Sequence, residues 1–201
     1  MGMRLGLISF ADANITRVVR SPSLAWRLIV LDSPTLDGVT QHSKSTARGK
    51  KTAIPKRAKA KPLRVLDLAA NEGTRCDLEK SWHGIHYLLT GSAWEGEPPL
   101  DFLVDGGRQV GRIDLEHGPV RAFRADAAQT IYQSLSGLSP YELRKRFNAR
   151  DMAAKEIYPD IWTGAALEED SLRYLMDNLD KLRAFLRQTV EAQLGFLVFL
   201  V

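Results

Sequence analysis

Two histidines three residues apart have the spacing in this sequence that most suggests metal chemistry. His83 and His86 fall on a predicted helix, DLEKSWHGIHYLLTG, so both side chains could reach the same ion. A zinc or iron site needs a third ligand, and the candidates are Glu95, Glu97, Asp101, His117 and Asp160. Such a site could activate water for a metal-assisted hydrolase. The pair lacks the longer signature of zinc-binding helices, and this absence favours a structural role for both histidines. In that role His83 lies at the surface and His86 is partly buried. We expect no cofactor.

The loop that follows this helix is the preferred place for a binding site. It carries an indole and two carboxylates in the run SAWEGE, and loops beside a rigid helix are where ligand sites are often built. A later segment, EIYPDIW, supplies further aromatic and acidic side chains. The candidate binding residues are His86, Tyr87, Trp94, Glu95, Tyr158, Asp160 and Trp162. The alternative is that the tryptophans fill the edge of the core and the acids are solvated.

No catalytic residue is assigned, because no residue pattern specifies a reaction. Glu95 and Glu97 lack the fixed separation that acid and base catalysis requires, and Cys76 has no nucleophile signature around it. The glycines of GGRQVG miss the dinucleotide-binding fingerprint and are typical of a turn. We therefore expect a small ligand-binding or protein-binding module with an unidentified partner, and leave open whether it is an enzyme, with the balance against one.

Basic residues are concentrated in one stretch of the chain. Residues 39–66 contain nine lysines and arginines and no acid, and without these nine charges the formal net charge of +4 becomes −5. The composition of about 33–62 predicts a disordered insertion. Through residues 44–64 this insertion could bind DNA or RNA without sequence preference, using Lys50, Lys51, Lys56, Arg57, Lys59 and Lys61. A solvated loop with no specific role is the alternative.

Length and composition favour one domain over residues 1–201. The single cysteine is typical of a reducing compartment, and neither a signal peptide nor a membrane-spanning run is recognised, so we expect a cytoplasmic protein without membrane contact. The pattern predicts an α+β fold, a single mixed domain with several helices packed on a small sheet.

Local signals place the elements of this fold. Strands are expected at 3–10, 120–123 and 196–201, the last buried and central, while 63–70 is either a strand or an extended segment. Helices are expected at 77–91 with Asp77 as its N-cap, after Pro99, at 125–135, from Pro140 with a capping box, after Asn148, and at 167–193 ended by Gly195; one or two more lie within 11–31. A leucine ladder on the last helix favours internal packing over a dimer seam.

Several of these motifs also resemble a known family. MGMRLGL, WHGIHYLLTG with AWEG close behind, IYPDIW and the terminal LGFLVFLV are similar to the YfbM-like family of bacterial proteins of unknown function. The resemblance covers nearly all of the chain except the basic insertion, where this sequence departs from the family pattern. It implies an α+β single domain in the cytoplasm and carries over no activity and no catalytic residue.

Overall fold

The computed structural model describes residues 2–30, 66–114, 118–162 and 168–201. The predicted basic insertion at 33–62 and all candidate nucleic-acid residues of 44–64 lie outside these ranges. His117 also lies outside them. Among the described helices, none combines the length and the apolarity that crossing a membrane requires.

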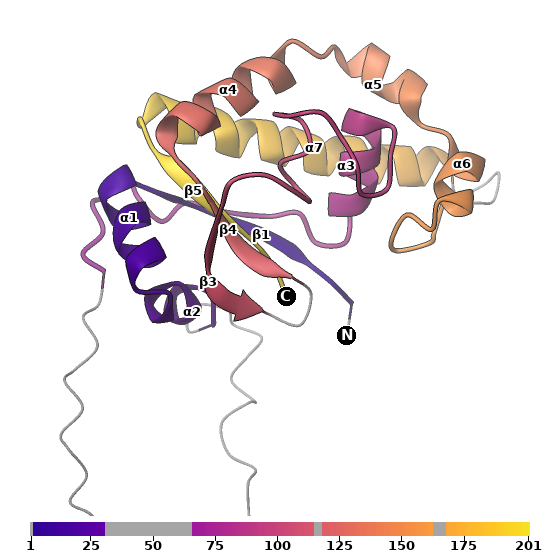
Figure 1. The fold of residues 1–201 in the computed structure, drawn as a ribbon. Helices are drawn as coiled ribbons and strands as arrows, with labels where there is room; N and C mark the ends of the chain where they lie inside the picture. Colours follow the sequence, from indigo (N-terminus) through magenta and orange to yellow (C-terminus); the bar gives the residue numbers. More distant parts are fainter. Residues whose placement is uncertain (1, 31–65, 115–117, 163–167) are drawn as a thin grey trace, which may run out of the picture.

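An antiparallel sheet forms the centre of the described chain (Figure 1). Its strand order is β2-β1-β5-β4-β3, and each neighbouring pair runs antiparallel. The strands are β1 (Leu5–Phe10), β2 (Arg75–Asp77), β3 (Arg108–Asp114), β4 (Pro119–Phe123) and β5 (Gly195–Leu200). The predicted central position of the C-terminal strand is confirmed, because β5 pairs with both β1 and β4.

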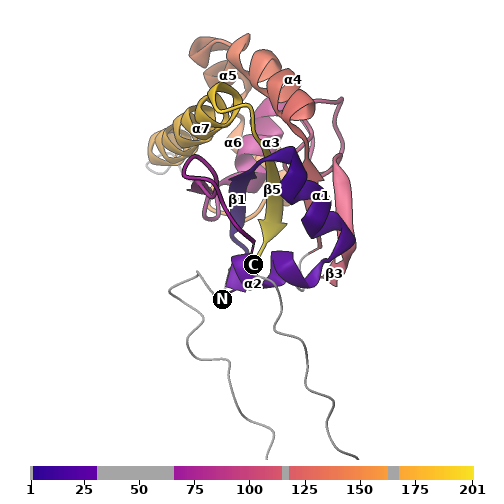
Figure 2. The ribbon, with the colours of Figure 1, turned by 90° about the vertical axis from the view of Figure 1, so that its left-hand side faces the viewer.

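Helices cover both faces of this sheet (Figures 1 and 2). One face carries α1 (Asp12–Arg20) and α2 (Ser23–Val30), and the other carries α3 (Trp82–Thr90), α4 (Ala125–Ser136) and α7 (Glu168–Glu191). The short helices α5 (Pro140–Arg146) and α6 (Ala149–Ala154) continue the second layer. These elements make the predicted α+β fold.

Alternation along the central strands divides the core between the two faces. Phe196 and Val198 of β5 pack with α3, α4 and α7, while Leu197 and Phe199 pack with α1 and α2. The continuous apolar run of β5 is therefore explained by burial on both sides. The leucine ladder of α7 is internal, since the side chains of Leu175, Leu179, Leu182 and Leu186 are fully buried.

Capping signals were good guides to the helices after β4. Ser139 accepts a hydrogen bond from the amide of Glu142 in a complete capping box, and Asn148 accepts one from the amide of Asp151. The helix that was expected at 77–91 begins later, at Trp82. Asp77 does not cap it, because Arg75–Asp77 pairs with β1 and the Asp77 carboxylate accepts from the Glu79 amide.

Two further predictions of secondary structure were wrong, and one strand was not predicted. Residues 98–104 form consecutive turns in place of a helix after Pro99. Of the two alternatives for 63–70, a strand or an extended segment, the described part contains no strand. The glycines Gly106 and Gly107 make the expected turn, but strand β3 follows them and was missed. The long helix ends at Glu191, and Gly195 is the first residue of β5 and does not stop the helix.

Candidate functional site

His83 joins the two sequence segments that were expected to form a site. It lies in the first turn of α3 and is almost completely buried. Its Nδ1 accepts a hydrogen bond from the amide of Tyr158 at 3.0 Å, and its Nε2 lies 2.7 Å from the carbonyl oxygen of Ala93. An Nδ1 that accepts carries no proton, so Nε2 carries it and donates to Ala93. The imidazole thus fixes both the loop after α3 and the loop after α6.

Burial keeps this imidazole neutral. The pKa of His83 is lowered mainly by loss of hydration, and the hydrogen bond to the Ala93 carbonyl opposes that change only in part. Protonation of Nδ1 would also remove the acceptor that the Tyr158 amide uses. His83 is therefore a neutral structural bridge, and the expectation that it lies at the surface was wrong.

An aromatic cluster surrounds the His83 ring and reaches solvent at one member. Trp82 stacks on His83 with ring centroids 4.8 Å apart, and Trp94 lies on it at 4.5 Å. Tyr158 is half-buried and stacks on Trp82 at 6.2 Å. Trp82 is fully buried, whereas 61% of Trp94 is exposed. Trp94 therefore presents an aromatic surface that is held in place from behind.

A small cavity opens beside the two tryptophans. Its volume is about 90 Å³, and its walls include Trp82, Trp94, Arg121 and Phe199. The indole Nε1 of Trp82 is buried and has no acceptor among the described residues. Since buried donors normally have a partner, this unpaired N–H is an exception among the described residues.

The segment after α6 is held by Trp162. The Trp162 Nε1 donates to the carbonyl oxygen of Ile157 at 2.6 Å, and both side chains are fully buried. The amide of Asp160 donates to the same carbonyl at 3.1 Å, which closes a turn and leaves the Asp160 side chain exposed. Trp162 thus positions Tyr158 and Asp160 but does not itself reach the surface.

His86 and Tyr87 also lie inside the molecule. His86 is completely buried, and its Nε2 lies 3.3 Å from the hydroxyl of Thr90. Burial, followed by the neighbouring His83, lowers the pKa of His86 from 6.5 to about 4, with the backbone of Glu95 acting in the opposite direction. The hydroxyl of Tyr87 donates to Asp151 at 2.6 Å, and burial together with this carboxylate raises the pKa of Tyr87. Tyr87 thus connects α3 to α6, whereas Thr90, beside His86, belongs to α3 itself.

The described residues give no support to a metal site. No group of three or more histidines, cysteines and acids within the described ranges is placed to hold an ion. Both nitrogens of His83 are already engaged. Of the candidate third ligands, Asp101 is buried with a pKa raised by loss of hydration, while Glu95, Glu97 and Asp160 are exposed. The metal-assisted hydrolase is not favoured.

Cys76 lies on β2 with its thiol buried. Loss of hydration, together with the nearby Asp77, raises the pKa of this thiol to about 12. A thiol with such a pKa is almost entirely protonated at neutral pH. This environment agrees with the absence of a nucleophile signature around Cys76 in the sequence.

The structure brings together only part of the expected site. Trp94, Glu95, Tyr158 and Asp160 come from the two loops that His83 joins, whereas His86, Tyr87 and Trp162 are buried. The exposed residues of these two loops, Trp94, Glu95, Glu97 and Asp160, together with the half-buried Tyr158, are called the Trp94 face below.

Arg121 has a structural role that its sequence context does not indicate. Its guanidinium donates to the carbonyl oxygens of Phe102 at 2.9 Å and Leu103 at 2.7 Å, and also to those of Asp105 and Gly106. Burial lowers the pKa of Arg121 to about 10. These bonds fix the turns that follow the Trp94 loop. No local pattern reveals this role, because the acceptors are backbone atoms 15 to 19 residues earlier in the chain.

Known proteins resemble this chain in sequence and in fold. A family model described as "Domain of unknown function (DUF1877)" matches residues 1–199. Protein YfbM of Escherichia coli strain K12 is 32% identical over 126 residues, which cover 57% of this chain and 71% of that protein. The crystal structure of YfbM from Escherichia coli, described as a protein of unknown function, matches with a TM-score of 0.65 and 19% identity over 98% of this chain and 99% of the other. The structural match shows a shared fold.

Proposed function

Because the chain belongs to the DUF1877 family of domains of unknown function, we propose its role from its own site: it is a binding module whose Trp94 face takes a cationic segment of a partner protein. The single observation that carries this proposal is the exposed indole of Trp94, fixed from behind by the neutral ring of His83. A rigid exposed tryptophan is the kind of side chain that dominates binding energy at protein interfaces.

The order of the Trp94 loop favours binding. The loop is held at Ala93 by His83, and the turns that follow it are held by Arg121. A surface that is already fixed loses little conformational entropy when a partner binds. Trp94 therefore offers its free ring face at low entropic cost.

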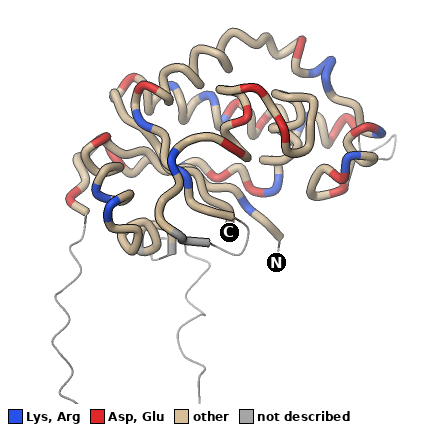
Figure 3. The backbone as a smooth tube through the Cα atoms, viewed as in Figure 1, with Lys and Arg blue, Asp and Glu red and all other residues tan. Residues whose placement is uncertain are grey.

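The charge around Trp94 favours a cationic partner. Glu95, Glu97 and Asp160 are exposed, and none of them forms an ion pair with another residue in the described ranges. The sequence contains no lysine or arginine between His83 and Gly107 (Figure 3). Arg121 lines the cavity beside Trp94, but its guanidinium donates to backbone carbonyls. An arginine or lysine could stack on the indole while its charge faces these carboxylates.

Titration with short peptides tests this proposal. We expect hexa-arginine to bind the protein in isothermal titration calorimetry and hexa-glutamate not to bind. The substitution Trp94→Ala should weaken hexa-arginine binding roughly tenfold or more, which is the usual cost of removing a central tryptophan. Trp26→Ala is the matched control, because Trp26 is 47% exposed on α2, away from this face.

Two results would contradict the proposal. One is the absence of hexa-arginine binding, and the other is an equal loss of binding in Trp94→Ala and Trp26→Ala. The second result would indicate a general attraction between a basic peptide and an acidic surface.

The domain organisation and the location of the protein are part of the same proposal. Pairing of β1 with both β2 and β5 ties the two sides of the basic stretch into one sheet, which supports a single domain over residues 1–201 with an insertion at about 33–62. The single buried cysteine supports a reducing, cytoplasmic location. Fractionation of the producing cells would contradict this location if the protein were found outside the cytoplasm.

A further inference from the structure

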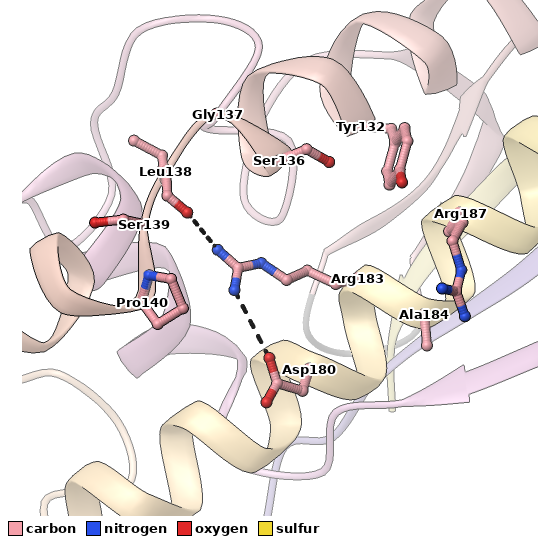
Figure 4. Close-up of a pocket in the computed structure, with 10 residues that line it drawn as sticks. All are labelled: Tyr132, Ser136, Gly137, Leu138, Ser139, Pro140, Asp180, Arg183, Ala184 and Arg187. Atoms are coloured by element: carbon pink, nitrogen blue, oxygen red, sulfur yellow. Dashed lines mark hydrogen bonds and ion pairs between the residues drawn. The ribbon is translucent and has the colours of Figure 1, made fainter.

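A cavity of about 560 Å³ lies between α4, the α4–α5 connection and α7 (Figure 4). Its walls include Tyr132 and Ser136 from α4, Leu138 from the connection, Pro140 at the start of α5, and Arg183 and Arg187 from α7. This volume is within the usual range for sites that hold small organic molecules. None of these residues belongs to the Trp94 face.

Arg183 is fixed at one wall of the cavity. Its guanidinium donates to the carbonyl oxygen of Leu138 at 2.7 Å and lies 3.7 Å from the carboxylate of Asp180 (Figure 4). Only 19% of the Arg183 side chain is exposed, and its Nε is buried without an acceptor among the described residues. The arginine is therefore held in place while one of its donors remains unused.

Arg187 adds a second positive charge one helical turn later. It is exposed and forms no ion pair or hydrogen bond with any residue in the described part of the chain. Like charges four residues apart on a helix repel each other. Asp180 is 69% exposed and lies beside Arg183, so it offsets one of these two positive charges and leaves the other on this wall. The α7 wall thus attracts an anion.

The α4 wall supplies hydroxyl groups and apolar surface. Tyr132 and Ser136 are one turn apart on α4, and neither hydroxyl bonds to another side chain or carbonyl within the described ranges. The ring of Tyr132 and the side chains of Leu138 and Pro140 provide apolar contacts. The α4 side of the cavity therefore offers two hydroxyl donors next to an apolar surface.

We propose that this cavity binds a small organic oxyanion, either a phosphate monoester or a carboxylate on an apolar body. The oxyanion pairs with the guanidinium of Arg187, beside the fixed positive charge of Arg183, and it accepts from the hydroxyls of Tyr132 and Ser136. The apolar body lies against Tyr132, Leu138 and Pro140. This site is independent of the peptide binding proposed for the Trp94 face.

Titration with phenyl phosphate and with benzoate, followed by amide NMR, tests the site and separates the two oxyanions. We expect at least one probe to bind saturably and to shift the amides of Ser136, Leu138 and Arg187. Arg187→Gln should weaken that binding roughly tenfold or more, because a hydrogen bond to a charged group is lost. Arg173→Gln is the matched control, since Arg173 is an exposed arginine of the same helix that pairs with Asp170.

Phenol, which has the ring without the oxyanion, should not bind. The proposal is overturned if neither oxyanion binds, if the shifted amides lie elsewhere, or if Arg187→Gln and Arg173→Gln weaken binding equally. Trp94→Ala should leave oxyanion binding unchanged. The oxyanion titration and the hexa-arginine titration therefore test the two proposals separately.

Discussion

Acidification should destabilise this protein at a pH where its carboxylates are still ionised. The pKa of His86 is about 4 in the folded protein, against 6.5 for an unperturbed histidine. The unfolded chain therefore binds more protons than the folded chain below about pH 6.5, and stability falls as the pH falls. Each pKa unit corresponds to about 1.4 kcal/mol, so complete titration removes about 3 kcal/mol from the free energy of unfolding. Most of this loss occurs before the pH reaches 4.5.

Urea unfolding followed by tryptophan fluorescence measures this loss at a series of pH values from 7 to 4.5. Carboxylates whose pKa is lowered by folding, such as Glu72, also contribute to the free energy of unfolding. They lose this contribution mainly below pH 4.5, because the ordinary pKa of glutamate is 4.5. His86→Leu removes the titrating group while keeping an apolar side chain of similar size. The difference between the two proteins at each pH therefore isolates His86. A native protein with equal stability at pH 7 and pH 4.5, or a variant with the same pH dependence, would refute this reasoning.

Two other substitutions should reduce the free energy of unfolding measured in urea. Gly84→Ala should cost about 1 to 3 kcal/mol, because the added Cβ would lie 2.6 Å from Leu175 and 2.8 Å from Trp162, where α3 packs closely against its neighbours. Ser139→Ala should cost about 1 kcal/mol, because it removes the acceptor for the Glu142 amide in the capping box of α5.

Each of these substitutions has a matched control. Gly137→Ala should have little effect, because the added Cβ would meet only ordinary contacts with Ser134 at 3.5 Å and Gln133 at 3.6 Å. A Gly84→Ala protein as stable as Gly137→Ala would show that stability does not depend on the close packing of α3 against Leu175 and Trp162. Ser139→Asp should retain the cap, and a loss equal to that of Ser139→Ala would exclude capping as the cause.

The elements that could be predicted are those whose signal is local. The apolar run of β5 and the leucine spacing of α7 report burial directly, and the caps at Ser139 and Asn148 act within three residues. By contrast, β2 is a three-residue strand with two exposed side chains, and its sequence Arg-Cys-Asp gives no strand pattern. It forms because β1 supplies a partner, which the local sequence does not reveal.

The candidate site was only partly predictable for the same reason. The sequence indicates that aromatic and acidic residues are concentrated near Trp94 and near Tyr158, but not which of them reach the surface. The sequence suggested His83 as a metal ligand, but in the structure it is a structural bridge. The hydrogen bond that shows this, from the Tyr158 amide, spans 75 residues. Trp162, expected in the binding site, is buried because it packs against α3 and bonds to Ile157.

The most direct test of the central claim is to locate the peptide on the protein by amide NMR during titration with hexa-arginine. Binding at the Trp94 face predicts that the amides of Trp94, Glu95, Tyr158 and Asp160 shift together as the peptide is added, because His83 holds both loops. Shifts confined to other surfaces, or shifts in only one of the two loops, would contradict the account.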